Sequence, residues 1–200
     1  MRIASWPAAI LAAVFVSAPL SAQDSADARL AALTDQWHAY RIEQFNQLEQ
    51  PDGSTEPGDR YWSETPAAHR TRAGFARDML AKLDAVPLAQ LSPAARIDAA
   101  VFRTLLQEQI GDAQFREWEM PFDSDSDFWS YLAARRAFDS AEDYRRYIAR
   151  MRDLPRFFDE QIANARSGLR RGFSVPAVTR EGRDASIAAH VVDAPEQSPF

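Results

Sequence analysis

The segment richest in chemically useful side chains is "FREWEMPFDSDSDFWSYL", residues 115–132. Within it, Asp123, Asp125 and Asp127 alternate as the first calcium ligands of an EF-hand loop do. The later positions do not match, because Phe128 stands where that loop needs glycine and Ala134 where it needs glutamate. Two interpretations stay open beside calcium: an acidic loop held by flanking rings, or a cleft with aromatic walls. The cleft interpretation gives four candidate substrate contacts: Trp118, Asp123, Asp125 and Trp129.

Groups for metal or nucleophilic catalysis are otherwise sparse. A zinc hydrolase needs two or three closely placed imidazoles or carboxylates and a general base. His38, His69 and His190 are isolated, and none is followed by glutamate or by a second histidine within one helical turn. The chain has no cysteine, no G-x-S-x-G elbow and no glycine-rich phosphate loop. The sequence therefore predicts no catalytic residue, no metal ligand and no cofactor in this chain.

The charge and composition exclude one class of partner. The 200 residues include 23 Lys and Arg against 29 Asp and Glu, which gives a formal net charge of −6. A nucleic-acid-binding surface is basic because it must match the phosphates, so no nucleic-acid partner is expected. The hydrophobic share of 46% and the charged share of 26% are typical of a soluble globular domain.

The first 22 residues, "MRIASWPAAILAAVFVSAPLSA", differ from the rest. An arginine precedes an apolar run that ends in small residues at Ala22, which is the layout of a secretory signal peptide. The alternative is a membrane anchor, but the run is barely long enough to span a bilayer and contains Pro7 and Pro19. We therefore expect a signal peptide over 1–22, export to the periplasm or medium, and no membrane association after its removal.

Residues 23–200 predict an all-α fold. Apolar residues recur every three to five positions from Ala26 to Leu48, which predicts one helix. The stretch "QPDGSTEPGD", residues 50–59, then predicts a loop. No alternating apolar pattern indicates a strand, although the loop at residues 115–132 leaves room for short strands. Helices should begin at Thr65-Pro66 and Ser92-Pro93, because a hydroxyl caps free N–H groups and proline suits the first helical position. Further helices are expected around 128–136, at about 179–192, and on either side of Leu154-Pro155.

Capping and periodicity also predict how these helices end and which sides they bury. Ser140 and Asp143 form a capping-box pattern, and either Gly168 or Gly172 can supply the left-handed residue that stops the helix beginning at Pro155. The predicted buried faces are Phe75, Met79, Leu80 and Leu83; Ile97, Val101, Phe102, Leu105 and Ile110; Tyr144, Tyr147, Ile148 and Met151; and Phe158, Ile162, Ala165 and Leu169.

Two long segments carry a family resemblance. "WEMPFDSDSDFW", followed by "DYRRYIARMRDLPRFFDEQIANARSGLRRGFSVPAVT", resembles the bacterial domain of unknown function 885 family. The matching elements are the aromatic-acidic segment, the R-x-x-x-L-P junction at Arg150–Pro155, and the spaced residues Gly168, Gly172 and Pro176. The resemblance covers roughly Leu30 to Phe200 and is strongest from Trp118 onward.

The resemblance implies a longer, mostly helical, often exported protein that is similar to zinc metallopeptidases. The family's metal motif, a His-Glu pair and a later Pro-Gly-His-His run, would lie downstream of the matched part, so zinc is expected only there. Residues 23–200 would then be a non-catalytic N-terminal scaffold, incomplete at its C-terminus, and a peptide substrate would concern the complete protein. The alternative is a free-standing exported helical binding module.

Overall fold

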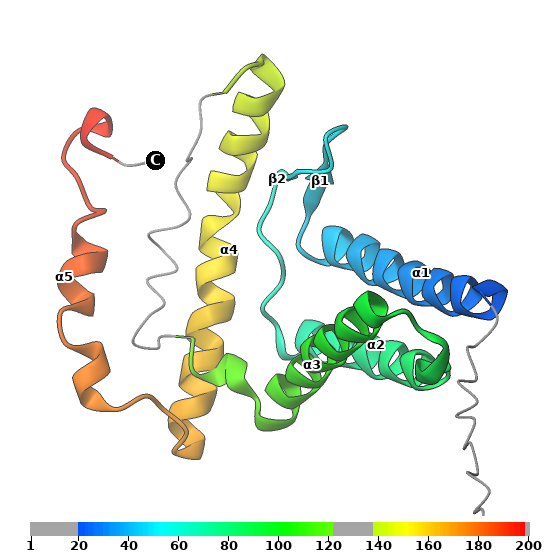
Figure 1. Cartoon of the computed structure of the whole chain (residues 1–200). Coiled ribbons are helices and arrows are strands. Elements are labelled where there is room, and N and C mark those ends of the chain that lie inside the picture. The colour runs from blue at the N-terminus through cyan, green and yellow to red at the C-terminus, as the bar shows by residue number, and fades with distance from the viewer. Residues whose placement is uncertain (1–19, 122–137, 199–200) are drawn as a thin grey trace, which may run out of the picture.

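The computed structural model describes residues 20–121 and 138–198, and these residues form a mostly helical fold (Figure 1). The prediction of an all-α architecture is confirmed. The α-helices of this part of the chain are α1 (Leu20–Gln44), α2 (Pro66–Asp84), α3 (Pro93–Phe115), α4 (Ala141–Arg171) and α5 (Arg183–Ala188). None of the described helices combines the length and the apolar character needed to cross a membrane.

The first three helices form a bundle, and α4 lies beside it. The contact between α2 and α3 is the most extensive, and α1 packs on both. In the view of Figure 1, α4 stands between this bundle and α5. A short 3₁₀ turn, η2 (Glu117–Glu119), follows α3 and contacts α4, so it links the two parts of the fold.

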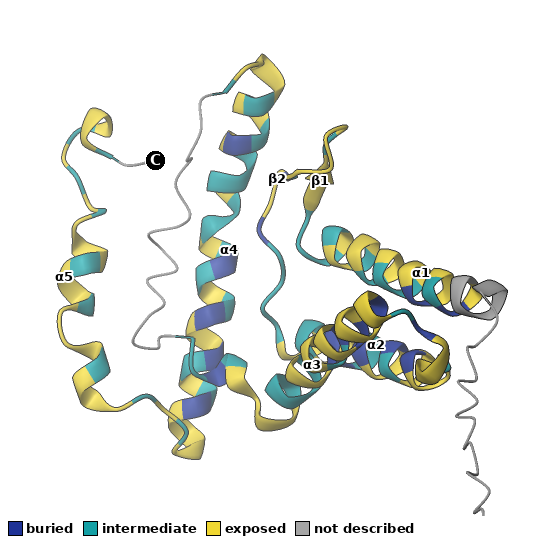
Figure 2. Cartoon of the chain, viewed as in Figure 1, coloured by how far each residue is buried: buried dark blue, intermediate teal, exposed yellow. Residues whose placement is uncertain are grey.

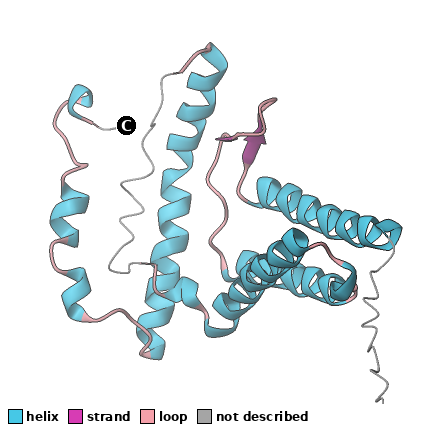
Figure 3. Cartoon of the chain, in the orientation of Figure 1, coloured by secondary structure: helices cyan, strands magenta, loops and turns pink. Residues whose placement is uncertain are grey.

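The loop predicted for residues 50–59 belongs to a small antiparallel hairpin, which the sequence analysis did not anticipate (Figure 3). Strand β1 (Gln47–Glu49) pairs with β2 (Thr55–Pro57). The turn between them closes because Gly53 adopts a φ of +80° and the Asp52 carboxylate accepts a hydrogen bond from the Ser54 N–H at 2.9 Å. The Asp52-Gly53 pair, a common hairpin turn sequence, could therefore have predicted this hairpin.

The predicted helix starts are confirmed at atomic detail. The Thr65 hydroxyl accepts from the Ala68 N–H at 3.2 Å, and the Ser92 hydroxyl accepts from the Ala95 N–H at 3.2 Å. Ser140 and Asp143 form the predicted capping box at the start of α4. Gly172, rather than Gly168, supplies the left-handed residue that ends this helix, with a φ of 72°.

The main core lies between α1, α2 and α3, but α3 does not bury the face that the sequence predicts (Figure 2). Phe102 and Leu106 are buried, whereas Ile97, Val101 and Leu105 are exposed by 66%, 56% and 44%. The buried side of α3 instead consists of Ala95, Ala99, Phe102 and Leu106, so two small side chains face α2 in place of Ile97 and Val101. Periodicity alone favoured the larger side chains. The buried core residues are Ala26, Leu30, Ala76, Met79, Leu83, Val86, Leu91, Ala95, Ala99, Phe102 and Leu106.

Helix α4 corrects two further predictions. It continues through Pro155, which lies exposed inside the helix, so the expected break at Leu154-Pro155 was wrong. Tyr147 is buried as predicted, but the other buried residues, Phe157, Gln161, Asn164 and Gly168, each lie one position before the predicted stripe of Phe158, Ile162, Ala165 and Leu169. As a result Ile162 and Leu169 are exposed. The inward face of α4 is largely polar because it binds the backbone of another segment, as described below.

The C-terminal part is less regular than predicted. The expected helix over 179–192 is divided into a 3₁₀ turn, η4 (Ala177–Arg180), and the short helix α5. Gly182 separates them with a φ of 78°. The helix expected around 128–136 lies outside the described residues.

Candidate functional site

The side of α4 that faces the bundle carries a row of polar side chains, Asp153, Arg156, Glu160 and Asn164, which we call the α4 polar row. These side chains bind the main chain of residues 61–64, the extended segment that leads into α2. The Asp153 carboxylate accepts from the Tyr61 N–H at 2.8 Å, and the Glu160 carboxylate accepts from the Glu64 N–H at 2.6 Å. The contact is therefore made from side chains to backbone.

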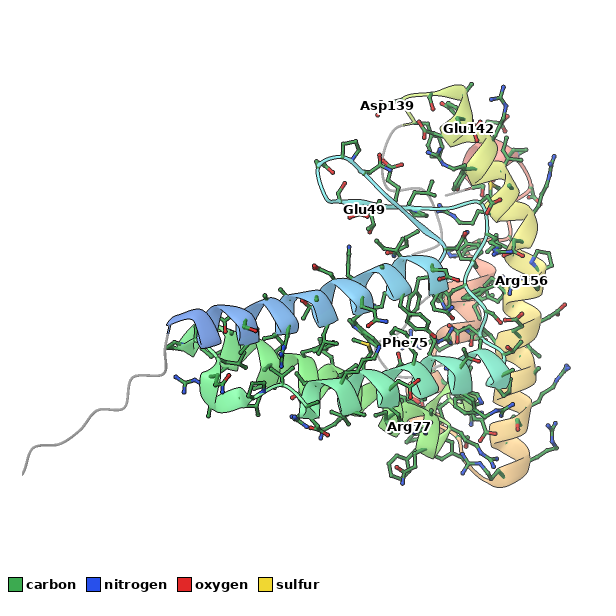
Figure 4. The ribbon with its side chains drawn as sticks, turned by 90° about the vertical axis from the view of Figure 1, so that its right-hand side faces the viewer. Glu49, Phe75, Arg77, Asp139, Glu142 and Arg156 are labelled. Carbon is green, nitrogen blue, oxygen red and sulfur yellow. The ribbon has the colours of Figure 1, made fainter. Side chains whose placement is uncertain are left out.

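The cation and the amide of the row complete this contact. Arg156 Nη2 donates to the Tyr61 carbonyl at 2.9 Å, and Asn164 Nδ2 donates to the Glu64 carbonyl at 2.6 Å. Figure 4 shows Arg156 on α4 where the chain before α2 passes the helix. Both hydrogen-bonding groups of the Tyr61 and Glu64 backbone are thus satisfied by α4, which fixes this segment against the helix.

Charge pairing within the row sets its electrostatics. Arg156 binds Asp153 at 2.6 Å and Glu160 at 2.8 Å. The hydrogen bond from Arg156 holds the pKa of Asp153 below its usual range, and the same bond raises the pKa of Arg156 above its own. Burial raises the pKa of the neighbouring Tyr61 phenol. All three groups therefore keep their ordinary charge states at neutral pH.

A second polar cluster lies at the N-terminus of α2 and contains Glu64, His69 and Arg72. His69 Nε2 forms no hydrogen bond of regular geometry, although Glu64 Oε2 lies 2.6 Å away. His69 Nδ1 lies 3.2 Å from Arg72 Nη2, and Arg72 Nη1 donates to the Ser63 carbonyl at 2.9 Å. Because a guanidinium can only donate, Nδ1 must accept, and the imidazole proton is placed on Nε2, toward Glu64.

This arrangement limits what His69 can do chemically. Both ring nitrogens face groups of the same chain, so neither is directed at a substrate in this conformation. The hydroxyl of Ser63 lies 3.1 Å from Thr65 Oγ1 and 3.3 Å from Glu160 Oε2. No contact between Ser63 and His69 activates that hydroxyl within the described structure. These contacts hold the chain before α2 against the first turns of that helix, which is a structural role rather than that of a general acid–base pair.

Of the four residues predicted to line a cleft, only Trp118 can be placed. It lies in η2 and stacks on the His69 ring, with a centroid separation of 4.8 Å and an interplanar angle of 21°. Asp123, Asp125 and Trp129 lie outside the described residues. Trp118 is therefore brought to the Glu64–His69–Arg72 cluster, a partner that the sequence analysis did not identify.

A buried carboxylate next to Trp118 joins η2 to the end of α4. Glu119 is 4% exposed and accepts from the Ser167 hydroxyl at 2.8 Å and from Arg171 Nε at 2.7 Å. Burial would raise the pKa of Glu119, but the Ser167 and Arg171 hydrogen bonds outweigh it and the pKa is lowered. Gly168 makes the approach possible, because a Cβ there would lie 2.4 Å from the Glu119 carbonyl oxygen.

Sequence reasoning missed both clusters, and one of them had a recognisable pattern. Thr65 is the N-cap of α2, so Glu64 and His69 occupy the positions just before the cap and four residues into the helix. Hydrophobic pairs often meet across these two positions, and here a carboxylate and an imidazole do. The α4 polar row had no comparable sequence signal, because its partners are backbone groups.

The described residues do not fit a zinc site. No three His, Asp or Glu side chains among them come together as the ligands of a metal ion would. His38 is exposed, and its Nε2 lies 3.9 Å from Glu49 Oε1, a single pair rather than the three ligands that a zinc site needs. His69, the histidine in closest contact with a carboxylate, has its second nitrogen against the Arg72 cation, which disfavours a metal ion there.

The family model described as "Bacterial protein of unknown function (DUF885)" matches residues 51–200. This match covers strand β2, helices α2 to α5, and both polar clusters. The chain belongs to the DUF885 family. No curated protein and no solved structure matches it. For this DUF885 member the site must therefore be interpreted from its own geometry.

Proposed function

We propose that this DUF885 chain is the helical N-terminal scaffold of an exported protein resembling zinc metallopeptidases, and that it is not catalytic by itself. The observation that carries the proposal is the pair of exposed apolar faces on helices α3 and α4. Helices of a complete soluble domain normally turn such stripes inward, because leaving a large side chain in water forgoes roughly 1.5–3 kcal/mol of burial.

The exposed face of α4 supports this proposal in particular. Its inward side is occupied by the polar row and its backbone partners, whereas Tyr144, Ile148 and Leu169 on other sides are 54%, 45% and 59% exposed. A helix fixed by polar contacts on one side and apolar on another is suited to packing between two layers. The further layer would be the catalytic portion that the family resemblance implies, where zinc and a peptide substrate would bind.

The scaffold role is tested by comparing this chain alone with the same chain fused to the downstream portion of a longer family member. Zinc content after dialysis and hydrolysis of a peptide library are measured for both proteins. We expect neither property in the chain alone and both in the fusion. Stoichiometric zinc or peptide hydrolysis by the chain alone would contradict the proposal.

Export is tested separately by expressing the full chain in a bacterium and determining the mass of the product outside the cytoplasm. Cleavage after Ala22 should remove residues 1–22. A product that still begins at Met1 would favour the membrane-anchor alternative instead.

The alternative function is a free-standing exported helical binding module, which the same exposed faces would also suit. The DNA after the Phe200 codon discriminates between the two. A continuing reading frame with a His-Glu metal motif supports the scaffold, and a stop codon followed by unrelated sequence supports the module.

A further inference from the structure

One exposed stripe of α3 combines apolar and acidic side chains in an ordered way. Residues 97, 101, 105, 108, 112 and 115 follow one another at intervals of three and four, so they share one side of the helix. The N-terminal half of the stripe is aliphatic, and Phe115 at its end is 67% exposed. We call this stripe the α3 outer face; its members are Ile97, Val101, Leu105, Glu108, Asp112 and Phe115.

The C-terminal half of the α3 outer face concentrates negative charge. The Asp112 carboxyl shares a hydrogen bond with the Glu117 carboxyl of η2, and Glu108 lies one turn before it. Among the described residues, no salt bridge joins Asp112, Glu108 or Glu117 to a cation, and Arg116 and Arg171 at this end of α3 and α4 both pair with Glu119. Burial, the hydrogen bond to Glu117 and the charges of Glu117 and Glu108 raise the pKa of Asp112 to about 7. This end of the α3 outer face is therefore acidic, with no ion pair to an Arg or Lys of the described residues.

We propose that the α3 outer face binds an amphipathic helix with aliphatic side chains over Ile97, Val101 and Leu105 and a Lys or Arg that pairs with Asp112 and Glu117. The charge pattern selects this occupant, because an uncharged helix would leave two carboxyls without a cation beside the covered apolar surface. This inference rests on the proposed scaffold function and specifies the chemistry of the layer that covers α3.

A second copy of the chain is the main competing occupant. The outer side of α4 places Ile162 and Leu169 beside Arg166, which is also an apolar and basic helix surface. Arg166, however, interrupts the apolar surface of α4 between Ile162 and Leu169, whereas the acids of the α3 outer face lie beyond its aliphatic half. We therefore assign the face to a separate basic helix, and self-association becomes an outcome of the test.

The test selects binders for the full chain from a library of helical peptides in which one side is randomised. We expect enriched peptides with aliphatic residues at i, i+3, i+4 and i+7 and a Lys or Arg one or two turns beyond. Val101→Asp should reduce their affinity at least tenfold, whereas Arg96→Asp, on another side of α3, should change it less than twofold. Enriched peptides without a cation preference, or unaffected by Val101→Asp, would overturn the proposal.

The charge contact has its own readout in the pH dependence of binding. A Lys peptide should bind about tenfold more tightly at pH 8 than at pH 6, since a carboxyl with a pKa near 7 must lose its proton to pair. Asp112→Asn should remove most of this difference, and a peptide with Gln in place of Lys should not show it. Equal pH dependence of the Lys and Gln peptides would contradict the assigned contact.

The oligomeric state of the full chain completes the design. Concentration-dependent association that Arg166→Glu abolishes, with no peptide enriched, would assign the face to a second copy and overturn the inference. Failure of the scaffold function is distinguishable, because zinc binding or hydrolysis by the chain alone contradicts that function without affecting peptide binding at α3.

Discussion

At the residue scale, Gly168 is required for the junction between η2 and α4. Gly168→Ala should destabilise the chain by about 1–3 kcal/mol, because its Cβ would lie 2.4 Å and 2.6 Å from the carbonyl oxygens of Glu119 and Phe173. The matched control is Gly111→Ala in α3, where no atom beyond the chain neighbours and the helix's own backbone lies within 4 Å of the added Cβ. That variant should gain about 0.5–1 kcal/mol, since alanine favours helix interiors. Urea unfolding measures both, and a gain at both positions would disprove the close approach.

Two carboxylates at the contacts of α4, Asp153 and Glu119, should make stability depend on pH. The folded-state pKa is lowered for Asp153 by its bond to Arg156, and for Glu119 by Ser167 and Arg171 against the effect of burial. A lowered pKa contributes stability above the unfolded value, about 4 for such groups, and this stability is lost as the pH falls through the folded pKa.

Asp153→Asn should accordingly flatten the fall in unfolding free energy below about pH 4, with a lower stability at pH 7. The control is Asp98→Asn, an exposed position on α3 for which no bond to the rest of the chain is described. The measurement is urea unfolding at intervals from pH 7 to pH 3. Identical pH profiles for Asp153→Asn and the parent chain would show that the carboxylate does not hold residue 61.

At the scale of the elements, Pro155 distinguishes one long helix from two. A proline in a helix interior lacks an N–H donor and crowds the carbonyl four residues earlier, so Pro155→Ala should stabilise the chain by about 1–3 kcal/mol. Pro66 and Pro93 open α2 and α3, where the N–H has no partner, and their replacement by alanine should change stability little. Thermal unfolding compares the three variants. No gain for Pro155→Ala would favour the predicted break at Leu154-Pro155.

The sequence allowed the local features of the elements to be predicted but not their mutual orientation. Thr65, Ser92 and Ser140 cap helices through hydrogen bonds to residues three positions away, so a short stretch contains all the information needed. The buried side of α3, by contrast, contains Ala95 and Ala99. The sequence of α3 alone does not favour burial of these alanines over Ile97 and Val101, because the buried side is determined by how α3 packs against α2.

The site was predictable only in part, for a related reason. Trp118 was identified as a functional candidate because of its acidic and aromatic neighbours, and the structure places it on His69. The residues that hold the segment 61–64 against α4 carry no motif, because Asp153 and Glu160 bind N–H groups, which nearly every residue has. Side-chain identity therefore could not indicate which segment they contact.

At the scale of the whole molecule, the apolar residues form two unequal groups. The larger lies between α1, α2 and α3, and the smaller joins Tyr61 to Phe157. Helix α5 has no buried residue, and α4 is held to the segment before α2 by this small apolar group together with the α4 polar row. We expect residues 23–200 alone to unfold with low cooperativity and to bind a hydrophobic dye at the exposed faces.

Substitutions on the two sides of α3 test this view. Leu106 is fully buried, so Leu106→Ala should cost about 2–5 kcal/mol. Val101→Lys should change stability by no more than about 0.5 kcal/mol and should reduce dye fluorescence, because Val101 is 56% exposed. A sharp, reversible melt without dye binding in the parent chain would instead support the free-standing module.

The backbone-directed contact of α4 has a consequence for the evolution of the family. Pairs of positions covary when one side chain compensates for a change in another, but Asp153, Arg156, Glu160 and Asn164 meet peptide groups at 61–64. An alignment of relatives should therefore show little correlated substitution between these two segments, although they are in direct contact. The replacement to be avoided at positions 61 and 64 is proline, the one residue that removes the bound N–H.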